Sequence, residues 1–256
     1  MTALHASLPM YDRPEMRAAT DAFWARLRDA LRARGIDAPE ALTRDQRSPW
    51  ALWQSPDLLL SQTCGLPLRA RLHDRVQLVA TPDFGHPDCP PGYYNSVLVT
   101  RRDLADRPLA ELVKMRIAMN EALSQSGWGA LCRFAQDRGL TLARPAATGG
   151  HAFSARAVLE GRAELAAIDA QTWRLLLRYE PELGTLAEIA RTDPTPALPL
   201  ITAKGRDPEP IFSALQAALA ALPAPDRETL GIRGFVRIPL ADYMALPIPP
   251  NPDEMP

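Results

Sequence analysis

The sequence predicts two α/β lobes joined by two strand-like crossings. Short apolar segments alternate with helical patterns along most of the chain, which is the order that βαβ units produce. A strand-like segment over 93–103 leads out of the first group of elements, and an extended segment over 188–203 leads back into it. We therefore expect a discontinuous first lobe, residues 1–97 and 195–256, and a second lobe of residues 98–194.

Each expected element is a periodic run bounded by some of the 26 prolines, which interrupt helices and central strands. In the first lobe we expect strands over 3–10, 57–62 and 75–82, and helices over 15–34 and 210–222. In the second lobe we expect strands over 115–120, 143–149 and 164–169, each followed by a helix. The proline-rich tail 247–256 is a poor candidate for regular structure.

The charge of the chain argues against nucleic acid as a partner. Its 29 lysines and arginines are balanced by 30 aspartates and glutamates, for a net charge of −1. No basic stripe that could follow a phosphate backbone stands out. The arginine-rich run over 25–35 carries apolar residues at helical spacing, so we interpret it as the solvated face of a helix.

The cysteines and the N-terminus bear on cofactors and location. Cys64, Cys89 and Cys132 have neither metal-ligand spacing nor the even number of a disulfide framework, so we expect no metal, no cofactor and a reducing compartment. The first residues lack the basic and apolar regions of an export signal, and no apolar segment is long enough to cross a membrane. We expect a cytoplasmic protein as written, a periplasmic one if the N-terminus was trimmed, and no membrane insertion.

Three loops of the second lobe are expected to meet at one edge of its sheet. Ser124, Ser126 and Gly127 follow its first strand, His151 follows the second, and Asp169 ends the third. Ligands of open parallel sheets bind beyond the carboxyl ends of the strands. Hydroxyl groups, backbone N–H groups and the positive end of a helix dipole together favour an anion. Each residue alone has the commoner alternative role of a helix cap, and their joint position favours binding.

The first lobe and the first crossing supply further candidates. Tyr11 follows the first strand, and Gln62 and Thr63 offer hydrogen bonds after the second. Tyr94 and Ser96 lie at the start of the first crossing, where a cleft between lobes would have its floor. The alternative is that these residues belong to a buried strand and turn and to core aromatics.

Four runs carry a resemblance to a known family. In order, "LLLSQTCGLPL", "YYNSVLV", "ALSQSGWGAL" and "TGGHAFSARAVLEGRAELAAID" resemble motifs of the phosphonate/phosphate-type substrate-binding proteins of ABC transporters. The resemblance covers 55–200 and is most specific from Thr148 to Asp169. It implies a two-lobed, periplasmic-binding-protein-like fold of type II, with two crossover strands and a ligand cleft between the lobes.

The resemblance also implies roles for single residues. The hydroxyl and glycine turn of the family falls on Ser124, Ser126 and Gly127, its histidine on His151, and its acid on Asp169. A further position, the hinge aromatic, falls on Tyr94. We expect Asp169 to discriminate among ligands, because a carboxylate near an anion favours protonated oxyanions or ligands with an amino group. We expect ligand binding to raise the pKa of His151 and therefore to strengthen toward acidic pH.

The resemblance points to a protein that closes on a small oxyanion of the phosphate, phosphite or phosphonate class. It would serve as a solute-binding component with an ABC permease as partner, or as a cytoplasmic sensor that a regulatory protein reads. The alternative is an enzyme on the same fold, with Cys64 as nucleophile and His151 as base. Because free cysteines are commonly buried and inert, we expect no catalytic residue.

Overall fold

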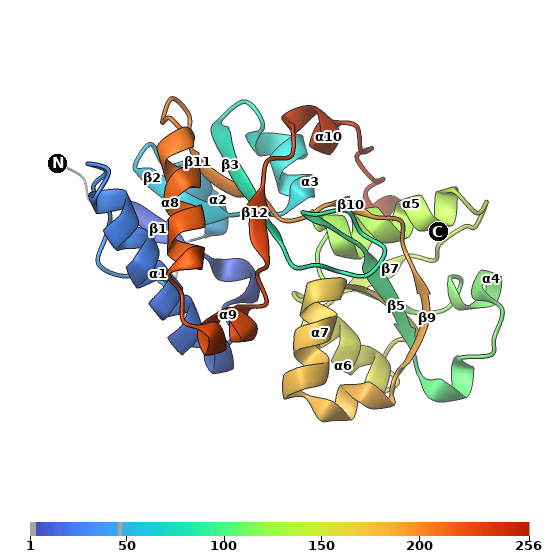
Figure 1. The fold of residues 1–256 in the computed structure, drawn as a ribbon. Coiled ribbons are helices and arrows are strands. Elements are labelled where there is room, and N and C mark those ends of the chain that lie inside the picture. The colour runs from blue at the N-terminus through green and yellow to red at the C-terminus, as the bar shows by residue number, and fades with distance from the viewer. Residues whose placement is uncertain (1–3, 46–47, 256) are drawn as a thin grey trace. The chain divides into compact units, whose positions relative to one another are not determined.

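A computed structural model describes residues 4–45 and 48–255 (Figure 1). The expected first strand began at Ala3, which lies outside these residues. The chain divides into two compact units. Unit 1 comprises Met1–Gly85 and Pro196–Ala245, and unit 2 comprises His86–Thr195 and Leu246–Pro256. The first unit is therefore discontinuous in sequence, and each unit contains its own sheet.

Unit 1 is built on a five-stranded sheet of order β1-β2-β11-β3-β12. Its strands are β1 (His5–Ser7), β2 (Leu58–Gln62), β3 (Val76–Asp83), β11 (Leu200–Ala203) and β12 (Gly234–Val236). β1 and β2 run parallel, whereas β11 is antiparallel to both β2 and β3, and β12 is antiparallel to β3. The segment that returns from unit 2 thus enters the middle of the first sheet.

Helices α1 (Arg17–Arg32) and α8 (Glu209–Ala220) pack against each other beside this sheet (Figure 1). Phe23, Leu27 and Leu31 recur at four-residue spacing in α1 and are buried, which is the pattern of a helix with one apolar stripe. The ring of Phe23 stacks on that of Phe235 in β12, with centroids 6.0 Å apart. The apolar periodicity over 15–34 therefore belongs to a helix whose apolar face covers the sheet.

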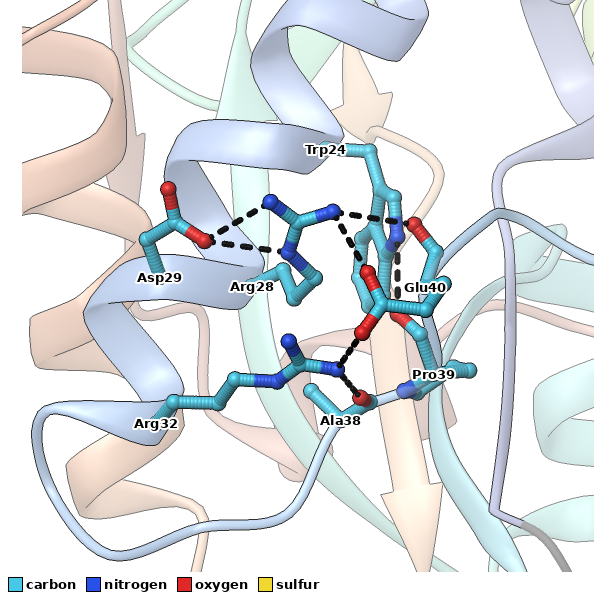
Figure 2. A network of polar contacts seen from close by, with 7 residues as sticks. All are labelled: Trp24, Arg28, Asp29, Arg32, Ala38, Pro39 and Glu40. Atoms are coloured by element: carbon cyan, nitrogen blue, oxygen red, sulfur yellow. Dashed lines mark hydrogen bonds and ion pairs between the residues drawn. The ribbon is translucent and has the colours of Figure 1, made fainter.

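The arginines of α1 form local ion pairs (Figure 2). Arg28 and Arg32 bind the carboxylate of Glu40 at 3.0 and 2.7 Å, and Arg32 also donates to the carbonyl of Ala38. The hydrogen bond from Arg32, followed by the positive charges of Arg32 and Arg28, lowers the pKa of Glu40. The network ties the segment after α1 back onto the helix, which agrees with a solvated helix face rather than a nucleic-acid surface.

The sheet of unit 2 has the order β7-β6-β8-β5-β9. Its strands are β5 (Ser96–Thr100), β6 (Ile117–Met119), β7 (Pro145–Ala147), β8 (Leu165–Asp169) and β9 (Ala187–Arg191). Strands β7, β6 and β8 run parallel, and β5 is antiparallel to β8 and β9. The three parallel strands correspond to the segments expected over 115–120, 143–149 and 164–169.

Helices cover the two sides of this sheet. Helices α6 (His151–Leu159) and α7 (Ala170–Tyr179) pack on Val97, Val99 and Ile168. On the other side, α5 (Ala130–Gln136) packs on the residues in between, such as Leu98 and Ala167. This alternation is what a strand buried on both sides requires, because successive side chains point in opposite directions. The continuous apolar strands of the sequence follow from that burial.

The remaining α-helices and β-strands are short. They are α2 (Pro49–Trp53), α3 (Gly65–Pro67), α4 (Leu109–Leu112), α9 (Ala224–Leu230), α10 (Leu240–Met244), β4 (Tyr93–Tyr94) and β10 (Thr195–Pro196). The expected strand over 93–103 is divided at Asn95 into β4 and β5, and the expected return crossing over 188–203 comprises β9, β10 and β11. Strand β12 was not expected.

The C-terminal residues belong to unit 2, although the sequence placed 246–256 with the first lobe. The indole of Trp128 donates to the carbonyl of Pro250 at 2.7 Å, and Arg144 pairs with Asp253 at 2.6 Å. Met255 packs against the core cluster beneath α5. These contacts depend on the indole of Trp128 and on a surface arginine. The hydrophobic periodicity of a sequence does not reveal such long-range contacts.

Tyr243 of α10 is hydrogen-bonded to two other segments of unit 1. Its hydroxyl lies 2.7 Å from Thr81 Oγ1 and donates to the carbonyl of Ala197 at 2.9 Å, and the side chain is fully buried. We expect Tyr243→Phe to lower the free energy of unfolding by about 1–3 kcal/mol, because two buried partners lose a bond. Urea denaturation measures this. In the double variant with Thr81→Val the losses should be less than additive; strict additivity would contradict the coupling.

Candidate functional site

The carboxyl ends of β6, β7 and β8 lie at the same edge of the unit 2 sheet, since these strands are parallel. Two of the loops that follow these strands are joined by backbone hydrogen bonds. The N–H of Thr148 donates to the carbonyl of Met119 at 2.8 Å, and that of Gly149 donates to the carbonyl of Asn120 at 2.9 Å. The convergence expected from the sequence is therefore present for the loops after β6 and β7.

The loop after β6 forms a tight turn that begins the π-helical segment η5 (Gln125–Gly129). The Oγ of Ser124 accepts from the N–H of Gly127 at 3.0 Å, so Ser124 has the capping role that was the alternative interpretation. Gly127 is required here for space. A Cβ at this position would lie 1.9 Å from the Oδ1 of Asn120.

Ser126 and His151 contact each other across the two loops. The Oγ of Ser126 lies 2.9 Å from the Nε2 of His151, and the Nδ2 of Asn120 lies 3.4 Å from the same nitrogen. An amide nitrogen can only donate, so Nε2 is the acceptor in this arrangement and the Ser126 hydroxyl donates to it. The structure thus brings together two predicted site residues and adds Asn120 to them.

Burial holds His151 in its neutral form. Although the residue as a whole is partly exposed, its Nδ1 is buried, and loss of solvation lowers the pKa of the imidazole to about 4. The backbone of Ala167 opposes this shift by hydrogen bonding. At neutral pH the groups that meet here, a hydroxyl, an amide and an imidazole, are all uncharged.

The loop after β7 positions the start of α6. The hydroxyl of Thr148 lies 2.7 Å from that of Ser154 and donates to the carbonyl of Gly150 at 3.1 Å. Gly149 has φ of +86°, a conformation that favours glycine. Helix α6 begins at His151, and the N–H groups of the first helical turn have no partner within the helix.

Asp169 ends β8 and caps α7. Its Oδ1 accepts from the N–H of Thr172 at 2.6 Å, which is the alternative role expected of it. Ser96 lies opposite Asp169 in the register of β5 and β8. Both backbone groups of Ser96 bond to Thr192, and Tyr94 is 1% exposed. The structure therefore places Ser96 beside Asp169 and buries Tyr94, while their contact with a ligand remains a prediction.

In unit 1, Gln62 and Tyr11 line a common cavity. The Nε2 of Gln62 donates to the carbonyl of Leu198 at 3.3 Å, and the ring of Tyr11 meets that of Phe84 edge to face. Thr63 is fully buried, its N–H donates to the carbonyl of Pro199, and its hydroxyl has no partner among the described residues.

The proposed pair of Cys64 and His151 gains no support from these surroundings. Cys64 belongs to unit 1 and His151 to unit 2, and Cys64 is buried. An imidazole with a pKa of about 4 is a weak base for a thiol, and its Nε2 already faces Ser126. Burial raises the pKa of Cys132 to about 12 and raises that of Cys89, so these thiols are protonated at neutral pH.

Two polar residues at this edge of the sheet were not predicted from the sequence. Asn120 follows β6 directly, and Ser154 lies one turn into α6. The position of Asn120 after a strand was a usable signal, because the same rule selected Ser124 and Asp169. No pattern distinguished Ser154 from an ordinary helical serine.

Solved structures share this fold over nearly the whole chain. PhnD1 from Prochlorococcus marinus, solved in complex with methylphosphonate, matches 94% of this chain and 94% of its own with a TM-score of 0.70 and 16% identity. XAC2383 from Xanthomonas citri, bound to ATP, matches 96% and 94% with a TM-score of 0.71 and 15% identity. A binding protein component of an ABC phosphonate transporter (PA3383) from Pseudomonas aeruginosa matches 91% and 80%, with a TM-score of 0.62 and 15% identity.

The chain therefore has the two-lobed α/β fold of the type II periplasmic binding proteins. A sequence model of the family described as "ABC transporter, phosphonate, periplasmic substrate-binding protein" matches residues 6–243, and the chain belongs to this family. The resemblance drawn from its motifs is confirmed. No curated protein matches the sequence.

Two further observations concern membranes and metals. Over the described residues, 4–45 and 48–255, no helix combines the length and the apolar character needed to cross a bilayer. Within the same part of the chain, no group of three or more histidine, cysteine, aspartate or glutamate side chains is arranged to hold a metal ion.

The close approach at Gly127 gives a prediction about the turn. In Gly127→Ala the new Cβ would displace Asn120 from His151, and we expect the free energy of unfolding to fall by about 1–3 kcal/mol, the usual cost of overpacking. Gly184→Ala is the matched control in unit 2, because its Cβ would lie 3.8 Å from Leu177. Urea denaturation of both variants tests this. Equal stability of the two variants would show that the turn has room.

The lowered pKa of His151 gives a prediction about acid stability. The folded-state pKa, about 4, lies below the ordinary value of 6.5, so the unfolded chain binds the proton more readily. The free energy of unfolding should therefore fall as pH decreases from about 6.5 to 4. We expect His151→Asn to lose less stability in this window than the parent, whereas His73→Asn, on the surface, should follow the parent. A parent and a His151→Asn variant with parallel pH profiles would contradict the shift.

Proposed function

We propose that this chain binds a small oxyanion of the phosphate, phosphite or phosphonate class at the edge of the unit 2 sheet. The ligand contacts would come from Ser126, His151 and Asn120 and from the first turn of α6. The observation that carries this proposal is the 2.9 Å contact between the Ser126 hydroxyl and the imidazole of His151, which is neutral because loss of solvation lowers its pKa. It aligns two polar side chains beside a helix N-terminus, where the dipole favours negative charge.

The contact suggests how the site would take up an anion. In the free protein the Ser126 hydroxyl donates to His151. To donate to a bound oxyanion the hydroxyl must turn away, and its Oγ can then accept from Nε2 only if that nitrogen carries a proton, as it does in the other neutral tautomer and in the protonated imidazolium form. A nearby negative charge favours that protonated form. Binding is therefore expected to raise the pKa of His151 from its low value, in the direction expected from the sequence.

A neutral site suits recognition by hydrogen bonds. Serine hydroxyl, amide and backbone N–H groups offer directed donors, and hydrogen bonds to a charged acceptor are roughly twice as strong as those between neutral groups. Two similar structures hold phosphorus oxyanions, methylphosphonate in PhnD1 and ATP in XAC2383, which supports the class. Phosphate, phosphite and phosphonates remain alternatives within that class.

The position of the Asp169 carboxylate limits how this residue could discriminate among ligands. Its Oδ1 is engaged by the N–H of Thr172, so the carboxylate is held at the start of α7. A fixed, buried carboxylate repels a fully ionised oxyanion and tolerates a protonated one. Asp169→Asn should change the ranking of anions if the residue has this role.

The family also bears on partner and location. Membership in a family of ABC transporter substrate-binding proteins supports a permease as partner, and the family description is periplasmic, one of the two locations expected from the sequence. We propose a solute-binding component in the periplasm. A ligand sensor read by a regulatory protein would use the same binding chemistry.

Titration calorimetry with phosphate, phosphite and methylphosphonate tests the site. We expect Ser126→Ala to bind its best ligand about 5- to 30-fold more weakly, the loss of one hydrogen bond to a charged group, about 1–2 kcal/mol. Ser213→Ala, in α8 of unit 1, is the matched control and should bind as the parent does. If Ser126→Ala binds every ligand with parent affinity while its circular dichroism is unchanged, the turn does not belong to the site.

A further inference from the structure

The described part of the C-terminal tail, residues 247–255, is held on unit 2 by polar and apolar contacts. The carbonyl of Pro250 accepts from the indole Nε1 of Trp128 at 2.7 Å. Arg144 pairs with Asp253 at 2.6 Å, and Met255 packs against the apolar cluster that contains Trp128. The end of the tail therefore lies beside α5, whose side chains belong to the same cluster (Figure 1).

Trp128 belongs to the same π-helical segment, η5, as the proposed ligand-binding residue Ser126. Its side chain is fully buried and packs with Leu131 and Phe134, while Pro250 supplies the acceptor for its N–H. A buried N–H that loses its acceptor has to move toward another partner or toward water, because leaving it unpaired is unfavourable. The core thus holds the ring of Trp128, and the tail holds its polar edge.

The turn that joins Trp128 to Ser126 has little room to adjust. At Gly127, between the two, a Cβ would lie 1.9 Å from the Oδ1 of Asn120. At Gly129 a Cβ would lie 3.2 Å from the side chain of Gln125. Because side chains pack directly on the backbone here, a displacement of the indole would also displace Ser126.

We propose that the C-terminal tail positions the oxyanion-binding turn, because its hydrogen bond to Trp128 holds the Ser126 hydroxyl in place beside His151. This inference rests on the proposed function. Trp128 is a positioning residue and not a ligand contact. The Oγ of Ser126 lies 2.9 Å from the Nε2 of His151, and a shift of about 1 Å would exceed hydrogen-bond distance. Affinity for the oxyanion should therefore depend on a segment 122 positions along the chain from the turn.

A pair of tryptophan variants tests the contact. The ligand is whichever of phosphate, phosphite and methylphosphonate the parent binds most tightly by calorimetry. Trp128→Phe removes the N–H donor and should weaken binding by about 5- to 30-fold, the effect expected for loss of the Ser126 hydrogen bond. Trp173→Phe is the matched control in unit 2, since this indole is also buried and donates to Glu188 at 2.6 Å. Both variants should be less stable to urea, but Trp173→Phe should keep the parent's affinity.

Variants of the tail test the same link without changing the turn. Asp253→Arg combined with Met255→Asp removes the ion pair to Arg144 and places a charge against the apolar cluster, which should release the tail. Affinity should fall by about 5- to 30-fold again, the same hydrogen bond being lost. Asp253→Glu combined with Met255→Leu keeps both contacts and should bind as the parent does. Circular dichroism checks that both double variants remain folded.

The Ser126→Ala background shows whether the tail acts through Ser126. The hydroxyl that the tail positions is absent there, so Asp253→Arg with Met255→Asp should change affinity by less than about twofold in that background. A tail that only stabilised unit 2 would weaken binding by the same factor with and without the hydroxyl. That second result would overturn the positioning role.

The outcomes separate the two proposals. If no oxyanion binds the parent, or Ser126→Ala binds as tightly as the parent, the proposed function is wrong and this inference falls with it. If Ser126→Ala weakens binding while Trp128→Phe and the Asp253→Arg, Met255→Asp variant keep the parent's affinity, only the role of the tail is overturned. An equal loss of affinity in Trp128→Phe and Trp173→Phe also overturns it.

Discussion

The hydrogen bond between Ser126 and His151 is the interaction on which the candidate site depends. It joins the loop after β6 to the start of α6, and so it fixes two strand ends of the unit 2 sheet relative to each other. Asn120 packs closely against Gly127, which follows Ser126, and its Nδ2 lies 3.4 Å from the same imidazole nitrogen. The parallel order of β7, β6 and β8 supplies the common edge, and this contact turns the edge into a defined arrangement of polar groups.

Loss of solvation around this contact explains why the imidazole is neutral. Burial removes the water that would stabilise an imidazolium, and the partners at Nε2 are a hydroxyl and an amide rather than a carboxylate. A charged histidine would attract any anion, whereas a neutral one leaves recognition to directed hydrogen bonds. An imidazole with so low a pKa is also poorly suited to remove a proton from the neighbouring Ser126 hydroxyl.

Much of the fold was predictable because burial leaves a clear periodicity. The strands over 57–62, 75–82, 115–120 and 164–169 were expected close to their observed bounds, and apolar residues on both sides of a sheet identify such strands. The edge strand β7, expected over 143–149, is largely exposed and was placed by its position between two helical patterns. Strand β12 was missed because Gly234 and an arginine-rich neighbourhood conceal its three residues. The tail was misplaced because its attachment to unit 2 depends on the indole of Trp128, a long-range contact that a single sequence does not encode visibly.

The candidate site was predictable only in part, and the reason is chemical. The rule that ligands bind at strand ends selected Ser126 and His151, but it selected the caps Ser124 and Asp169 equally, because a helix that follows a strand needs a cap at the same position. What separates these roles is the partner: the oxygens of Ser124 and Asp169 accept from backbone N–H groups, whereas Ser126 meets a side chain that can change its protonation state. Side-chain partners across a sheet edge follow from packing, so the distinction between a cap and a ligand-binding hydroxyl is available only from the three-dimensional arrangement.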